Sequence, residues 1–150
     1  MISPVRLATA ALLLAVVLPL AGCGSPGTPS PTPGGASDVI AALGERGVTV
    51  HEQVSDDDGC ERTDLNDIAQ RLHVSTAGDT TQREVYLFRW QGASDFDQSA
   101  SDFFFCVGDF RSQHPGGVIE VVEHSPWRAY GADWSAELTT AVRQAVEAPT

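Results

Sequence analysis

The chain has 150 residues, with 20 acidic side chains against 9 basic ones and a formal net charge of −11. This length fits one domain with an extension and excludes a large multidomain enzyme. The apolar fraction of 42% excludes a wholly disordered chain. The negative charge argues against nucleic acid as a partner, because a phosphate backbone must be met by clustered Lys and Arg.

The N-terminal segment is typical of an export signal. Arg6 precedes an apolar run over residues 7–20, which is shorter than the roughly 20 residues of a membrane span and close to a signal-peptide core. The motif Leu20-Ala21-Gly22-Cys23 then resembles the lipobox of bacterial lipoproteins. The resemblance implies a signal peptide over residues 1–22 and acyl chains such as palmitate on Cys23, which would anchor the mature protein outside the cytoplasm on the cell membrane. An ordinary signal peptide cut at Ala21 or Gly22 is the alternative.

A linker separates this leader from the only predicted domain. Residues 23–37 are mostly Pro, Gly, Ser and Thr after the cysteine and contain no large apolar side chain. Such a segment adopts extended conformations and cannot build a core. We therefore expect one globular domain over residues 38–150, held away from the membrane by a flexible spacer.

The first half of the domain predicts a helix followed by strands. A helix capped by Ser37 or Asp38 should end at Gly47, before a strand over residues 48–54. The motif Asp56-Asp57-Asp58-Gly59 lacks the spaced ligands and closing Glu of a calcium loop, so it predicts a solvated acidic turn. Residues 64–76 fit a helix or a strand. We favour a strand over residues 68–76, because it would form a hairpin with the strong strand pattern over residues 84–90.

The second half predicts two helices around one strand. Phenylalanines at helical spacing predict a helix over residues 95–113, and residues 118–123 predict a strand. Ser125-Pro126 should break that strand, and a loop should run to Asp133, where the last helix begins. The order α-β-β-β-α-β-α predicts an α+β fold with a small mixed or antiparallel sheet of about four strands covered by helices.

The cysteine count predicts a disulfide. If Cys23 carries lipid, Cys60 and Cys106 remain as an even pair in an exported chain. A bridge between them would connect the acidic turn to the helix over residues 95–113. Two free buried thiols are the alternative.

No sequence motif identifies a catalytic site. The chain has no nucleophile elbow, zinc-protease motif, phosphate loop or dinucleotide motif. The histidines are scattered without ligand spacing, so neither a metal nor a cofactor is indicated. The most distinctive segment is the predicted loop before the last helix, because Trp, Tyr and Arg are common in binding sites. The candidate binding residues are His124, Trp127, Arg128, Tyr130 and Trp134. Packing of both tryptophans into the core is the alternative.

Leader, linker and short domain together resemble the small lipoproteins of high-GC Gram-positive (actinobacterial) bacteria. The resemblance implies a location and an architecture but no activity. We expect a non-catalytic module that binds an envelope protein or a small ligand. A small hydrolase or metal-dependent enzyme whose site is assembled only in three dimensions is the alternative, and a purely structural envelope factor is a third possibility.

Overall fold

The computed structural model describes residues 34–60 and 64–148. Five antiparallel strands form one sheet in the order β1-β2-β3-β5-β4. The strands are β1 (Val48–Ser55), β2 (Ala69–Thr76), β3 (Arg83–Arg89), β4 (Ile119–His124) and β5 (Trp127–Ala132). The helices are α1 (Ala36–Glu45), α2 (Ala93–Gln98), α3 (Ala100–Gln113) and α4 (Ala136–Glu147), with a short 3-10 turn, η1 (Asn66–Ile68), before β2. The predicted α+β class is confirmed, with one strand more than expected.

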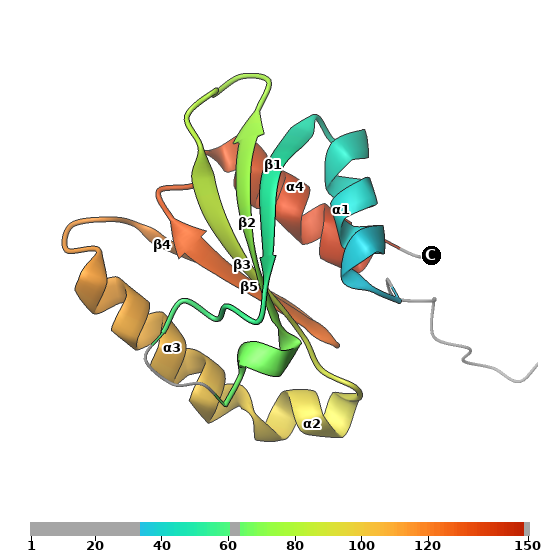
Figure 1. Cartoon of the computed structure of the whole chain (residues 1–150), viewed down its shortest axis with the longest axis vertical. Helices are drawn as coiled ribbons and strands as arrows, with labels where there is room; N and C mark the ends of the chain where they lie inside the picture. The colour runs from blue at the N-terminus through green and yellow to red at the C-terminus, as the bar shows by residue number, and fades with distance from the viewer. Residues whose placement is uncertain (1–33, 61–63, 149–150) are drawn as a thin grey trace, which may run out of the picture.

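Helices cover both faces of the sheet (Figure 1). On one face α1 and α4 lie side by side over the strands, and apolar residues such as Leu72, Val85 and Val142 form the core beneath them. On the other face α3 covers only one part of the sheet, over an aromatic core that includes Phe88, Phe103 and Tyr130. The polar side of β1 and β2 extends beyond α3.

The two terminal helices begin close to the predicted positions. Asp38 accepts a hydrogen bond from the Gly35 N–H at 2.9 Å, and α1 therefore begins at Ala36, two residues before the predicted domain boundary. Ser135 caps α4 by accepting the Leu138 N–H at 3.1 Å, so this helix starts after Asp133 rather than at it. The apolar side of α4 is buried and consists of Leu138, Ala141, Val142, Ala145 and Val146.

The remaining differences lie between residues 93 and 132. The helix predicted over residues 95–113 is two helices, because the backbone leaves the helical path at Ser99. Residues 127–132 form β5 instead of a loop. The strand predicted over residues 68–76 is confirmed as β2, and its hairpin with β3 as well.

A disulfide joins Cys60, in the loop after β1, to Cys106 of α3. The predicted signal peptide, Cys23 and most of the linker lie outside the described residues. Within residues 34–60 and 64–148, no helix has both the length and the apolar composition to cross a membrane.

Candidate functional site

The predicted binding loop is wrong, because its residues belong to a hairpin inside the sheet. Only Ser125 and Pro126 separate β4 from β5, and β5 pairs with β3 on its other side. A strand paired on both sides turns its side chains into the two cores. The exposed fraction is accordingly 1% for Trp127, 0% for Tyr130 and 7% for Trp134. These side chains contribute to packing, and they offer no exposed aromatic loop to a partner.

Two members of the predicted site differ from the aromatic ones. His124 is exposed at the end of β4. Arg128 is buried, with an exposed fraction of 2%, and its guanidinium carbon lies 3.7 Å from the ring centre of Phe96 and 4.9 Å from that of Trp90. Its Nε donates to Glu123 at 2.8 Å. Arg128 therefore stabilises the aromatic core and does not reach an open surface.

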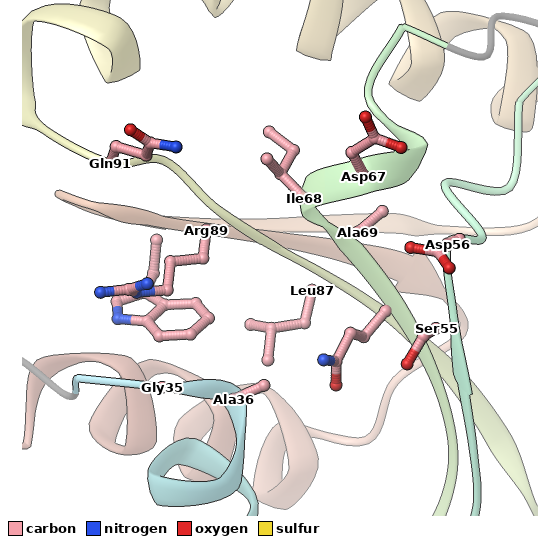
Figure 2. Close-up of a pocket in the computed structure, with 12 residues that line it drawn as sticks. Gly35, Ala36, Ser55, Asp56, Asp67, Ile68, Ala69, Leu87, Arg89 and Gln91 are labelled. Carbon is pink, nitrogen blue, oxygen red and sulfur yellow. The ribbon is translucent and has the colours of Figure 1, made fainter.

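An open pocket lies at the end of the sheet where α1 begins (Figure 2). Its volume is about 360 Å³, which is within the range of small-molecule sites. The ends of β1 and β3, the 3-10 turn η1 and the first residues of α1 supply its walls. Leu87 lies across the middle of the pocket, and the buried ring of Trp127 forms part of the wall beside Arg89.

Opposite charges line opposite sides of this pocket. Arg89 and Gln91 lie on one side in Figure 2, and Asp56 and Asp67 lie on the other. All four side chains are exposed, and none forms an ion pair or side-chain hydrogen bond with another described residue. The guanidinium of Arg89 is 5.9 Å from the ring centre of Trp127, which leaves its N–H groups available. The pocket therefore offers a cation, two carboxylates and an apolar wall to one small molecule.

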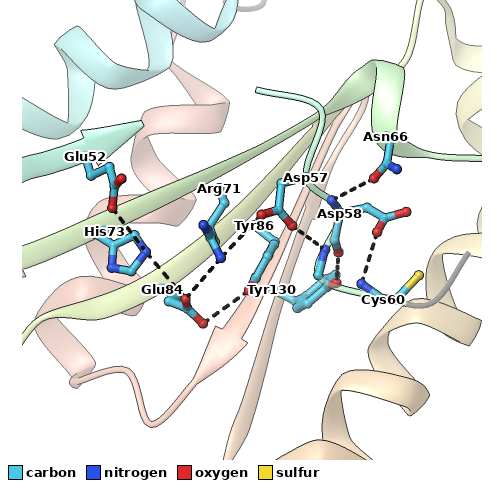
Figure 3. Close-up of polar contacts among 11 residues, drawn as sticks. Glu52, Asp57, Asp58, Cys60, Asn66, Arg71, His73, Glu84, Tyr86 and Tyr130 are labelled. Carbon is cyan, nitrogen blue, oxygen red and sulfur yellow. Dashed lines mark hydrogen bonds and ion pairs between the residues drawn. The ribbon is translucent and has the colours of Figure 1, made fainter. Parts of the chain in front are cut away.

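A second group of polar side chains crosses β1, β2 and β3 on the face that α3 leaves open (Figure 3). His73 Nε2 lies 3.7 Å from Glu52 and 3.5 Å from Glu84. Arg71 contacts Glu84 at 3.8 Å and Asp57 at 3.3 Å. Arg71 and Glu84 form a cross-strand pair of opposite charge between β2 and β3, and such a pair stabilises a sheet by about 0.2–1 kcal/mol. We interpret the group as an ion-pair ladder that holds the open face of the sheet.

The predicted solvated turn is only partly solvated, because Asp56 is exposed whereas Asp58 is buried. Asp58 is only 2% exposed, its N–H donates to Asn66 at 3.1 Å, and its carbonyl accepts the hydroxyl of Tyr130. Burial raises the pKa of Asp58, and the charge of Asp57 raises it further, against the opposing hydrogen bond from the Cys60 N–H. The turn is thus fixed over the aromatic core by its own backbone.

One group of side chains in the described part of the chain has atoms close enough for a metal ion. It consists of Asp58, Cys60 and Cys106, and the two sulfur atoms are joined in the disulfide. A disulfide sulfur is not a thiolate, which is the form that binds metals. The oxidised protein therefore does not present this group as a metal centre.

Comparisons with known proteins add no assignment: no family model, no curated protein and no solved structure matches the chain. The site is defined by its geometry alone. Sequence reasoning missed Arg89, Gln91 and Asp67, which belong to no motif, and it noticed Asp56 only as part of the acidic turn. Their common signal is weak: each lies at or next to an end of a predicted strand, where side chains reach the end of a sheet.

Proposed function

We propose that the protein is a lipid-anchored extracytoplasmic module that binds a small solute in the pocket at the start of α1. The lipobox resemblance and the linker support the anchor, and a pocket with charged but unpaired side chains supports binding. Removal of charged groups from water is unfavourable unless they gain partners. Arg89, Asp56 and Asp67 are exposed at the pocket and have no ion-pair partner among the described residues, so a ligand of complementary charge can pair with them without breaking an existing ion pair.

The arrangement of charges indicates the class of solute. A carboxylate or phosphate group suits Arg89, and an ammonium group suits Asp56 and Asp67 on the other side. The apolar side chains of Leu87 and Ile68 between them suit a short aliphatic part. The chemistry that fits all three is a small dipolar molecule, such as a free amino acid or a dipeptide. This charge arrangement is the observation that carries the proposal.

Calorimetry on the purified protein tests the binding. The probes are a set of free amino acids and dipeptides, with aliphatic monocarboxylates and monoamines of similar size as controls. We expect a dipolar probe to bind more tightly than either singly charged control. A charge-assisted hydrogen bond contributes about 1.5–3 kcal/mol, so Arg89→Gln and Asp56→Asn should each weaken binding about tenfold or more.

Arg143→Gln is the matched control, because Arg143 is exposed on α4 and does not line the pocket. It should leave the affinity unchanged. Equal binding of dipolar and singly charged probes, or equal weakening by Arg143→Gln, would contradict the proposal for the pocket.

The anchor is tested separately. Mass spectrometry of the mature protein should find acyl chains on an N-terminal Cys23, and Cys23→Ala should move the protein from the membrane fraction to the soluble one. A Cys23→Ala protein that stays in the membrane fraction rules out the lipid anchor but leaves the pocket untouched.

A further inference from the structure

Asp58 and the disulfide share one buried space. A carboxylate oxygen of Asp58 and the sulfur atoms of Cys60 and Cys106 all lie within 4.8 Å of one another. Asp58 is 2% exposed and Cys106 is fully buried, whereas Cys60 is partly exposed. A titratable group therefore lies within 4.8 Å of a bond whose reduction requires protons.

The two oxygens of Asp58 have different environments. One accepts the Cys60 N–H at 3.0 Å (Figure 3). The other, Oδ2, is buried and has no hydrogen-bond partner in the described structure. A buried carboxylate oxygen without a partner is costly when it is charged and much less so when it holds a proton. The loop thus keeps a proton-binding position beside the disulfide.

We propose that Cys60–Cys106 is a thiol–disulfide exchange site in which Asp58 supplies the proton to the departing sulfur of Cys106. The reductant is a dithiol. Its thiolate attacks Sγ of Cys60, the partly exposed sulfur, and a mixed disulfide forms there. The bond between the two cysteines breaks with its electron pair on Sγ of Cys106, which takes the proton of the Asp58 carboxyl.

The second step completes the reduction. The remaining thiol of the reductant loses its proton to solvent, and its thiolate attacks the reductant sulfur of the mixed disulfide. This releases Cys60 as a thiolate, which takes a proton from water, and the reductant leaves as its own disulfide. Two electrons pass from the dithiol to the protein, and Asp58 regains a proton from solvent.

The position of Cys106 explains why a nearby proton donor matters. Cys106 belongs to the aromatic core, with Phe103, Phe110 and Tyr130 in the same buried cluster. A thiolate formed among aromatic rings lacks solvent, and its formation is unfavourable unless it is neutralised as it leaves. Among the residues that the structure describes, Asp58 is the carboxyl group with an oxygen within 4.8 Å of both sulfur atoms.

The other charged and titratable groups around Asp58 come from every neighbouring element. The loop itself carries Asp57 and Asp64, and Arg71 of β2 forms an ion pair with Asp57. Asp109 of α3 acts on the hydroxyl of Tyr130. The hydroxyls of Tyr86 on β3 and Tyr130 on β5 complete the set. The negative charges of Asp57 and Asp64 favour a protonated Asp58, and Arg71 partly offsets Asp57.

The rate of reduction tests the proposal. Dithiothreitol reduces the purified protein from about pH 4, close to the ordinary pKa of an aspartate, to about pH 9. Released thiols are trapped by alkylation, and the rate constant is divided by the thiolate concentration. In the wild type this corrected constant should fall about tenfold as Asp58 loses its proton. In Asp58→Asn it should stay level, and Asp97→Asn, which removes an exposed carboxylate of α2, should follow the wild type. An identical fall in Asp58→Asn overturns the proposal.

A second measurement needs no variant. A monothiol such as cysteamine, applied to the native protein and quenched early, should leave the mixed disulfide on Cys60, as located by peptide mass spectrometry. A mixed disulfide mainly on Cys106 would contradict the proposed direction of attack.

Discussion

Arg128 and Glu123 form an ion pair that is buried at one end only. The Nε of Arg128 donates to Oε1 of Glu123 at 2.8 Å, and the side chain of Arg128 is 3% exposed while that of Glu123 is 39% exposed. One guanidinium nitrogen, NH1, has no hydrogen-bond partner in the part of the chain that the structure describes. The aromatic core therefore contains a positive charge that depends on a single surface carboxylate and on the rings around it.

This asymmetry predicts that substitution of the two partners changes the free energy of unfolding by different amounts. Glu123→Ala leaves a buried charge without its counterion and should lower the free energy of unfolding by about 3 kcal/mol. Arg128→Met removes the charge and keeps most of the volume, so it should change that free energy by about 1 kcal/mol or less. Urea denaturation of both variants measures the difference. A larger loss in Arg128→Met than in Glu123→Ala would show that the ring contacts outweigh the ion pair.

Substitution by alanine should destabilise the protein to different extents at two glycines with positive φ. At Gly116 (φ +88°) a Cβ would meet nothing within 4 Å, whereas at Gly59 (φ +68°) it would lie 2.4 Å from the ring of Tyr86. Gly116→Ala should therefore cost only the backbone strain, about 1–2 kcal/mol. Gly59→Ala should cost about 1–3 kcal/mol more, because the buried Tyr86 ring is held by Phe110 and Tyr130. Thermal unfolding of the two variants checks the order, and equal losses would contradict the tight contact.

The alkaline titration of tyrosine should be coupled to unfolding. Burial raises the pKa of both tyrosines of the chain; the charge of Glu84 raises that of Tyr86 further, and Tyr86 raises that of Tyr130. The native pKa values thus exceed the unfolded value of about 10, and the unfolded chain loses protons first, so the native state loses stability as the pH rises above about 10. Tyrosinate absorbance in the native protein should rise only together with the loss of circular dichroism. In denaturant both should titrate near the unfolded value.

Loss of the disulfide should destabilise the domain by about 4 kcal/mol on the chain-entropy model, given its sequence separation of 46 residues. The double variant Cys60→Ala/Cys106→Ala tests this by urea denaturation. Wild type reduced beforehand by a phosphine is the control and should unfold at a similar midpoint. A double variant as stable as the oxidised wild type would show that the bridge does not restrain the unfolded chain.

The elements that the sequence predicts correctly are those with a local periodic pattern. The apolar spacing of residues 138–146 defines the inner side of α4, and alternation identifies β2 and β3. β5 was missed because Ser125-Pro126 was interpreted as the start of a loop, although two residues are enough to connect antiparallel strands. The aromatic residues that follow Pro126 belong to an inner strand and not to a binding loop.

The pocket could not be predicted in the same way. Asp56, Asp67 and Arg89 meet only because three strand ends and the 3-10 turn converge at one end of the sheet. Residue periodicity indicates which side of an element is buried but not which ends come together. The sequence does not predict the burial of Asp58 for a related reason. Three adjacent Asp residues indicate a solvent-exposed turn, and only the structure shows the contact of this loop with Tyr130.

The first and last helices of the domain, α1 and α4, cover the same face of the sheet and contact each other. The apolar side of α1, with Val39 and Leu43, is therefore covered only after the final helix has been synthesised. This layer of the core therefore needs both ends of the domain at once. A chain cut short before α4 would leave Val39 and Leu43 without that cover.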